Sequence, residues 1–311
     1  MKMIKTLALL LTSLLFIQGF SQSPDKKNKK DKKKDKKDTE VSTQTWLWEI
    51  SGNGLKQPSY LYGTIHILCP IDFKISDSLK SKLEKSQQLV LEVVDADNPM
   101  HMVTFMESFM MEGKKLKDFY TEKEYEEIRK FFNDSVGVDV NMYGMMSPMF
   151  FIIATLPKMI GCEFPKSYEV ELTKLARAQG KEVKEVETLE GQLSLFDTIP
   201  EHIQAKELLR VVREWNKEKQ TFNGLVQMYR SQDFDKSVAF MHAHMGNMVE
   251  YKDILLDNRN QEWIAKIKTM AAEKPTLFAF GAGHLGGDKG LVELLKKEGY
   301  TLTPVKNELE N

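Results

Sequence analysis

Apolar and polar residues alternate along this chain in two distinct patterns. Short runs bounded by turn residues, most of them apolar, are typical of strands, and they occupy residues 45–50, 59–66, 89–94, 182–186, 276–280 and 300–305. Longer segments with helical periodicity lie between them, at 76–85, 100–111, 121–134, 148–161, 168–179, 190–197, 201–222, 224–231, 257–272 and 290–298. The first two runs predict a hairpin, and the order strand, helix, strand over 59–94 predicts a parallel βαβ unit. We therefore expect an α/β fold: a mixed central sheet with a large helical insertion between its two halves.

The first 44 residues do not fit this pattern. Residues 1–22 carry Lys2 and Lys5 ahead of a short apolar run and then small polar residues, which is the layout of a secretory signal peptide. The alternative is an uncleaved anchor, although the run is short for a membrane span. Residues 23–44 are rich in lysine and predict a disordered tether, leaving 45–306 as one folded domain.

The distribution of charge limits the classes of molecule that could bind this protein. Residues 1–40 hold 11 of the 44 basic residues and 5 of the 45 acidic ones, so residues 41–311 hold 33 and 40, a net charge of −7. An acidic body argues against a nucleic-acid partner, and only the lysine-rich tether could contact a membrane. The two cysteines, Cys69 and Cys162, either pair in an oxidising compartment or remain two buried thiols.

Two Gly-x-x-His segments carry the most specific chemical signal. Gly63–His66 and Gly281–His284 each follow directly on a predicted strand. Because α/β folds place their sites at the carboxyl edge of the sheet, we expect the two histidines to converge on one pocket.

Three further residues are candidates for the same pocket. Glu92 lies toward the end of a strand otherwise made of Leu and Val, where an unpaired carboxylate is costly, and Glu187 directly follows the strand at 182–186. Arg259 on a predicted helix could hold a carboxylate or an oxyanion. Glu190 could join them or simply serve the dipole of a helix capped by Thr188. Arg259 could equally lie on an exposed helix face.

Two histidines, one or two carboxylates and an open position form a catalytic metal site. We expect His66 and His284 to bind a divalent transition metal (Mn, Co or Zn), with Glu187 or Glu92 as a further ligand and the other glutamate activating water. Arg259 would hold the substrate or the developing oxyanion.

These segments resemble the TraB/GumN family, which includes the TIKI proteases. The resemblance covers nearly all of 45–305 and rests on segments 46–54, 59–66, 89–92, 187–193, 259–263 and 281–285. It implies a fold of the erythromycin-esterase-like and ChaN-like kind, with a site formed by the Gly-x-x-His motifs and nearby glutamates. This chain departs from the family pattern at Gly191, where an acid is common.

Together, residues and resemblance predict an exported metal-dependent hydrolase, periplasmic or extracellular, that acts on peptides or proteins. Two alternatives stay open: a haem- or metal-binding protein without turnover, and a non-catalytic protein that sequesters a peptide. The sequence does not predict the substrate or the oligomeric state.

Overall fold

The fold is described from a computed structural model, which defines residues 45–94, 99–244 and 246–309. The predicted signal peptide and tether lie outside these residues. The strands are β1 (Leu47–Gly52), β2 (Ser59–Thr64), β3 (Gln88–Leu91), β4 (Glu182–Glu185), β5 (Thr276–Gly281) and β6 (Tyr300–Val305). The α-helices are α2 (Asp77–Lys85), α3 (Pro99–Ser108), α4 (Glu122–Phe131), α5 (Pro148–Ala154), α6 (Leu156–Ile160), α7 (Tyr168–Ala178), α8 (Leu189–Ser194), α9 (Glu201–Arg213), α10 (Trp215–Arg230), α11 (Phe234–Ala243), α12 (Asn258–Glu273) and α13 (Leu291–Lys297).

The six strands form one mixed sheet in the order β4-β3-β5-β2-β1-β6. The four strands β4, β3, β5 and β2 are parallel, and β1 pairs antiparallel with both β2 and β6. The predicted hairpin of β1 and β2 is confirmed. The predicted parallel βαβ unit of β2, α2 and β3 is confirmed, with β5 inserted between its two strands. That insertion depends on a strand almost 200 residues further along the chain, so local pattern could not reveal it.

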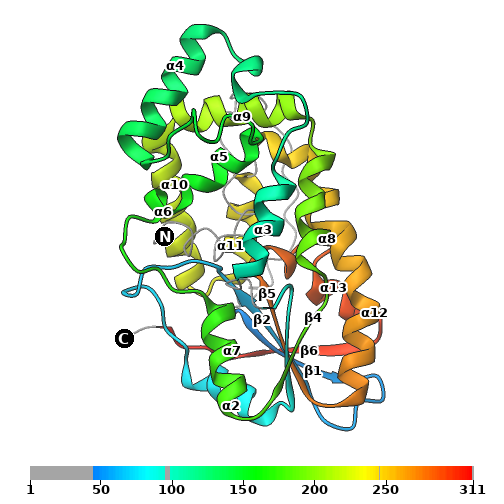
Figure 1. The fold of residues 1–311 in the computed structure, drawn as a ribbon. Coiled ribbons are helices and arrows are strands. Elements are labelled where there is room, and N and C mark those ends of the chain that lie inside the picture. The colour runs from blue at the N-terminus through cyan, green and yellow to red at the C-terminus, as the bar shows by residue number, and fades with distance from the viewer. Residues whose placement is uncertain (1–44, 95–98, 245, 310–311) are drawn as a thin grey trace, which may run out of the picture.

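Helices cover both faces of the sheet. The crossovers through α2 and α7 run in one direction across the sheet, and the crossover through α12 returns in the other. Since such crossovers are right-handed, α2 and α7 lie on one face and α12 on the opposite face (Figure 1). Every residue of β2, β3 and β5 is buried as a result.

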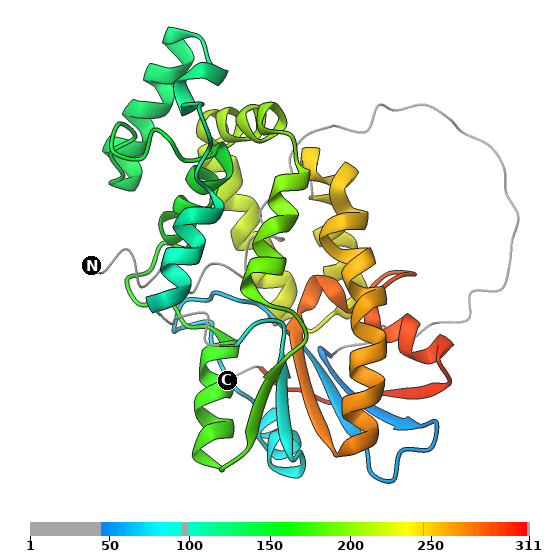
Figure 2. The same cartoon turned by 45° about the vertical axis from the view of Figure 1, so that its right-hand side comes forward.

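The helical insertion stands on the carboxyl edge of the parallel strands. It comes from two segments, α3 to α6 between β3 and β4, and α8 to α11 between β4 and β5. They pack as one body above the sheet, with α5 against α9, α3 against α8 and α6 against α10 (Figure 2). The fold class predicted from the sequence is confirmed, and the insertion consists of two separate segments of the chain.

Three predicted helices are divided differently in the structure. The segment 148–161 breaks at Thr155, where Pro157 cannot donate the next backbone hydrogen bond of the helix. The predicted helices 201–222 and 224–231 form α9 and α10 with the break at Glu214. Helical periodicity continues on both sides of Glu214, so only the packing of the insertion defines where the chain bends. Among the described residues, no helix combines the length and apolar character needed to cross a membrane.

Candidate functional site

The first Gly-x-x-His segment ends β2 and turns into the carboxyl edge of the sheet. Gly63 is required there by close packing, since an added Cβ would lie 2.8 Å from a ring carbon of Trp46 and 3.0 Å from Leu285. Three residues later, His66 is only 1% exposed. The glycine therefore lets the strand end pack tightly, and the histidine is held in the interior.

His66 is held by a carboxylate that the sequence did not single out. Its Nδ1 lies 2.7 Å from Oε1 of Glu169, at the start of α7. Glu169 also accepts hydrogen bonds from the hydroxyls of Thr64 and Ser167, at 2.5 and 2.6 Å. Because Nδ1 donates to the carboxylate, proton transfer or ligand binding by this imidazole takes place at Nε2.

The two partners shift each other's pKa. Burial by itself lowers the pKa of His66, but the charge and hydrogen bond of Glu169 outweigh it and raise the pKa above its ordinary value. Burial favours the neutral form of Glu169, yet His66 and the two hydroxyls lower its pKa to about 2. The pair is therefore a buried base whose conjugate acid is stabilised by an adjacent anion.

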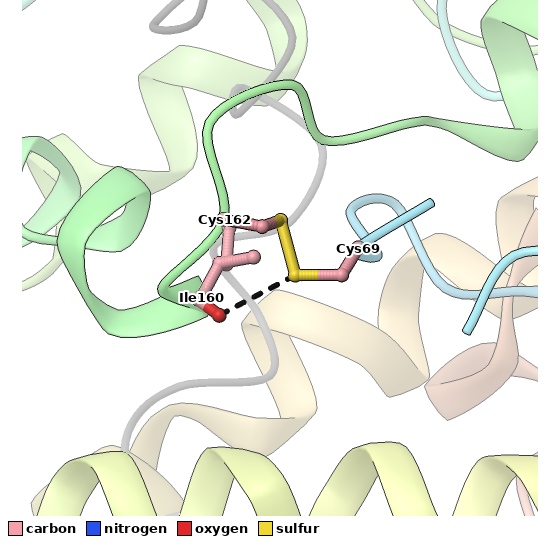
Figure 3. The surroundings of a disulfide bond; sticks show 3 residues. All are labelled: Cys69, Ile160 and Cys162. Carbon is pink, nitrogen blue, oxygen red and sulfur yellow. Dashed lines mark hydrogen bonds between the residues drawn. A yellow bond between two sulfur atoms is a disulfide. The ribbon is translucent and has the colours of Figure 1, made fainter. Parts of the chain in front are cut away.

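A disulfide fixes the loop that delivers Glu169. Cys69, just after His66, pairs with Cys162 in the loop between α6 and α7 (Figure 3). An isolated antiparallel bridge between Leu68 and Lys166 joins the same two loops. Of the two alternatives left by the sequence, the paired cysteines are the one present. Both crosslinks hold the approach to α7 against the segment that carries the histidine.

The second Gly-x-x-His segment ends β5, the strand next to β2. His284 is fully buried, and its Nδ1 lies 2.6 Å from Oδ1 of Asn260 on α12. Its Nε2 lies 3.1 Å from Nη1 of Arg259, and the indole of Trp263 packs against its ring at 4.4 Å between centroids. Burial first, then the charges of Arg259 and His66, lower the pKa of His284 well below its ordinary value.

The register of the sheet explains why the two histidines share one site. Thr64 pairs with Gly281 in the parallel ladder of β2 and β5, so both segments leave the sheet at the same level. Each histidine has its Nδ1 bound to a side-chain oxygen and turns Nε2 away from that partner. The predicted convergence thus follows from strand adjacency, which the two sequence motifs alone could not establish.

Arg259 is the centre of the cluster. Its Nη2 donates to Oε2 of Glu92 at 2.9 Å and also to Oε1 of Glu187, while Nε donates to Oε2 of Glu187 at 3.1 Å. Its Nη1 donates to the carbonyl of Leu255 at 2.8 Å. The side chains of Arg259 and Glu92 are 4% and 2% exposed, so these are buried charge-assisted hydrogen bonds. Arg259 therefore does not lie on an exposed helix face, which was the alternative that the sequence left open.

The two glutamates meet because they end neighbouring strands. Glu92 follows β3 and Glu187 follows β4, and the backbone N–H of Glu187 donates to the carbonyl of Glu92 at 3.1 Å. Oε1 of Glu92 accepts from the backbone N–H of Gly281 at 2.7 Å and lies 3.9 Å from Nε2 of His284. Burial raises the pKa of Glu187, and the charge of Glu92 adds to this while Arg259 opposes it.

Gln192, on α8, links the two carboxylates. Its Nε2 donates to Oε2 of Glu92 at 3.1 Å and to Oε1 of Glu187 at 2.9 Å. The carboxylates fix the orientation of this amide, because only its nitrogen can donate to them. The Oε1 atom of Gln192 is buried and has no hydrogen-bond partner among the described residues.

The remaining candidate, Glu190, lies outside the cluster. Thr188 caps α8 by accepting from the backbone N–H of Gly191, and Glu190 is an exposed acid in the first turn. Of the two interpretations given for Glu190, service to the helix dipole is the one that fits.

Two members of the site escaped sequence reasoning. Glu169 occupies the first turn of α7, where an acid is ordinarily explained by the helix dipole, so nothing marked it as a partner of His66. Gln192 lies five residues after Glu187, and only the start of a helix directly after β4 turns it back toward both glutamates.

The expected metal ligands His66, His284 and Glu187 are already engaged by other groups of the protein. Within the described parts of the chain, no three His, Cys, Asp or Glu side chains are grouped so that they could hold a metal ion. Glu187 gives both oxygens to Arg259, and the same guanidinium faces Nε2 of His284. The donor types suit a transition metal, but their placement does not, because Arg259 already supplies the cation that these groups bind.

The sequence profile of the TraB/PrgY/gumN family matches residues 46–304, which include every residue of the cluster. No curated protein and no solved structure matches the chain significantly.

Proposed function

The chain belongs to the TraB/PrgY/gumN family, and from this premise and the geometry of the cluster we propose that it is a hydrolase that cleaves peptide bonds. The observation that carries the proposal is the pairing of His66 with Glu169 in the same buried region as Arg259, whose charge acts on His66. A histidine oriented by a buried carboxylate is a general base, and a buried guanidinium is a stabiliser of developing negative charge. A purely structural cluster would have no need to keep a basic imidazole in the same interior space as a cation.

In the proposed reaction, Nε2 of His66 takes a proton from a water molecule while the water oxygen bonds to the carbonyl carbon of the substrate. Glu169 stabilises the imidazolium that forms, because its carboxylate accepts a hydrogen bond from Nδ1–H throughout the reaction. When the tetrahedral intermediate breaks down, the imidazolium returns its proton to the leaving nitrogen. The C–N bond breaks, and the products are a carboxylic acid and an amine.

Arg259 supports the oxyanion of that intermediate. One of its N–H bonds is directed at the neutral Nε2 of His284, a weaker acceptor than an alkoxide. The developing oxyanion would replace His284 as the acceptor of that hydrogen bond. Glu92 and Glu187 hold the guanidinium in place during this exchange, and Glu187, with its side chain 13% exposed, lies nearest to solvent.

The unpaired oxygen of Gln192 gives the site an acceptor for substrate. A buried carbonyl oxygen without a partner costs free energy that a peptide N–H can recover on binding. This favours an amide substrate over an ester, which has no such donor.

Metal dependence remains a prediction. We derive no step through a metal, since the donors as placed do not form a metal-binding group. If Mn, Co or Zn does bind, Arg259 must first leave the glutamates, and metal content then has to depend on His66 and His284.

We also propose that the protein works in an oxidising compartment, as an exported protein of the periplasm or the extracellular medium. The Cys69–Cys162 disulfide supports this, because such bonds rarely persist in the reducing cytosol. The acidic net charge of residues 41–311 supports peptide or protein partners and not nucleic acid.

The test is digestion of a defined peptide mixture by the full chain, with new amino termini identified by mass spectrometry. Reactions run with EDTA and with added Mn, Co or Zn, and metal content is measured on the same samples. We expect His66→Ala and Glu187→Gln to lower the rate by about 100-fold or more. Glu190→Gln is the matched control for Glu187→Gln, since Glu190 is exposed and lies outside the cluster.

Three outcomes decide between the alternatives. New termini that persist in EDTA support the proposal as written. Termini that require metal, with the metal lost in a His66→Ala/His284→Ala variant, support the metal-dependent form. Peptides that bind but stay intact under every condition refute a hydrolase and favour a sequestering protein.

A further inference from the structure

Two crosslinked loops carry large apolar side chains that project into solvent. The loop after the first histidine motif and the loop before α7 are joined by the disulfide (Figure 3) and by two backbone hydrogen bonds between Leu68 and Lys166, at 2.9 and 2.8 Å. Ile71 in the first loop is 84% exposed, and Phe164 in the second is 65% exposed. Single exposed apolar residues are common, but a pair on adjacent loops is a candidate interaction surface.

Ile71 projects from a rigid turn. The backbone N–H of Asp72 donates to the carbonyl of Cys69 at 2.9 Å and closes the turn, and Pro70 inside it has a fixed φ. Cys69 is held by the disulfide, and the carboxylate of Asp72 pairs with Arg230 at 2.6 Å. Because the backbone of this turn is already ordered, inserting Ile71 into a partner costs little conformational entropy.

Lysines surround the two apolar side chains. Lys166 is exposed on the second loop, and Lys158 is exposed on α6, the helix directly before that loop. The carbonyl of Ile160, at the end of α6, lies 3.5 Å from Sγ of Cys69, so this helix lies beside the turn. Lys74 is half-buried in the first loop, three residues after Ile71. Long basic side chains of this kind can reach past an apolar residue to a charged surface.

The chain enters the folded domain close to these loops. The hydroxyl of Thr45 donates to the carbonyl of Val305, at the end of β6, at 2.5 Å. Two residues later, Asn307 accepts a hydrogen bond from the hydroxyl of Ser76, so the segment after β6 lies beside the end of the first loop. Residues 23–44, with nine lysines and five acids, therefore join the domain at this place.

The charge of this surface is opposite to that of the domain as a whole. Two of its acids are paired, Asp72 with Arg230 and Glu308 with Lys306. Five cations against three acids give a local net charge of +2, whereas residues 41–311 carry −7. The cations are Lys74, Lys158, Lys166, Arg230 and Lys306, and the acids are Asp72, Glu163 and Glu308.

We propose that these loops dock the folded domain on an anionic lipid bilayer. Ile71 and Phe164 insert at the interface, and the lysines around them contact the acidic headgroups. A side chain that projects as far as Ile71 is covered best by a medium that closes around it, and the positive charge beside it matches an anionic surface. The lysine-rich segment adds attraction at the same place. This inference does not depend on the proposed hydrolysis.

The test is flotation of the exported chain, its amino terminus determined by mass spectrometry, with vesicles of phosphatidylcholine alone or mixed with phosphatidylglycerol. We expect half of the chain to bind the mixed vesicles at a lipid concentration on the order of 0.1–1 mM. Ile71→Ser/Phe164→Ser should weaken that binding by about tenfold or more, because it removes the inserted apolar area. Met142→Ser/Val249→Ser is the matched control, since these residues are 73% and 54% exposed on other segments, and it should bind like wild type.

A second pair of variants tests the charges. Lys158→Gln/Lys166→Gln should weaken binding to the mixed vesicles by roughly fivefold per lysine and leave binding to phosphatidylcholine alone unchanged. Circular dichroism and thermal melting confirm that each variant is folded.

The proposal is overturned if wild type does not float with the mixed vesicles, which would favour a protein as the partner of these loops. It is also overturned if Ile71→Ser/Phe164→Ser binds as tightly as wild type, since the lysine-rich segment alone would then account for binding. Equal binding of wild type to both vesicle types would refute the part assigned to the lysines.

Discussion

Replacing Arg259 by methionine removes the cation that two buried glutamates share. In the native protein the guanidinium makes three hydrogen bonds to Glu92 and Glu187 and one to a backbone carbonyl. Methionine fills much of the same volume but leaves both carboxylates without a counter-charge. Breaking a buried ion pair in this way costs about 3–5 kcal/mol of unfolding free energy. We expect Arg259→Met to lose that amount.

The matched control is Arg213→Met. Arg213 also binds two carboxylates, Glu124 and Glu127, but its side chain is 47% exposed. Solvent screens such pairs, so we expect a loss of no more than about 0.5–1 kcal/mol. The two variants differ in burial and not in residue type or partner type, so the difference between them measures the effect of burying the charges.

The assay is equilibrium unfolding of the full chain in urea at pH 7.5, followed by circular dichroism. A second arm lowers the pH toward 5. Without Arg259 the pKa of Glu187 rises further above its value in the unfolded chain, because burial already raises it and the opposing charge is gone. The folded variant then takes up protons more readily than the unfolded chain, so its deficit relative to wild type should shrink as pH falls.

A loss below about 1 kcal/mol at pH 7.5, equal to that of Arg213→Met, would refute the reasoning. It would mean that the glutamates find another cation or are already neutral. Adding Glu187→Gln to Arg259→Met provides a further check, since removing one of the stranded charges should recover part of the loss.

Three further predictions concern the scaffold of the site. Cys69→Ser/Cys162→Ser opens a crosslink that spans 93 positions of sequence and should cost roughly 2–5 kcal/mol in urea unfolding, with wild type in reductant behaving alike. Glu169→Gln should lower the free energy of unfolding by about 2–3 kcal/mol in the pH range 4.5 to 6.5. The difference from wild type should disappear as pH falls toward about 2, where the native carboxyl protonates. It should also decrease as pH rises and His66 loses its proton. Gly63→Ala should lower the free energy of unfolding by about 1–3 kcal/mol, because the added methyl group would overlap the packed ring of Trp46. An unchanged melting temperature would count against that contact.

Much of the fold could be predicted from local pattern. Apolar runs predicted β2, β3 and β5, and the predicted helix at 76–85 begins at Ser76, whose hydroxyl caps α2 by accepting from the backbone N–H of Leu79. These features depend on a few neighbouring residues, so periodicity and capping rules suffice to find them. The break at Glu214 escaped the same rules because helical periodicity continues through it.

The candidate site, like the fold, could be predicted only in part. His66, His284, Glu92 and Glu187 could be identified because each follows a strand, and strand ends can be read from sequence. Their convergence on one pocket was expected from the strand ends, but the strand order that brings them together could not be predicted, because it depends on β5 entering the sheet between β3 and β2.

The sequence by itself determined which side chains stand at the edge of the sheet and that the chain is α/β. Only the tertiary structure decided what each side chain meets there. It shows that His66 pairs with a carboxylate at the start of α7, 103 residues away, and that both glutamates accept hydrogen bonds from Arg259. The physical reason is that a buried charge is stable only beside its counter-charge. Local pattern can show that such a partner is needed, but the packing of distant elements determines which residue supplies it.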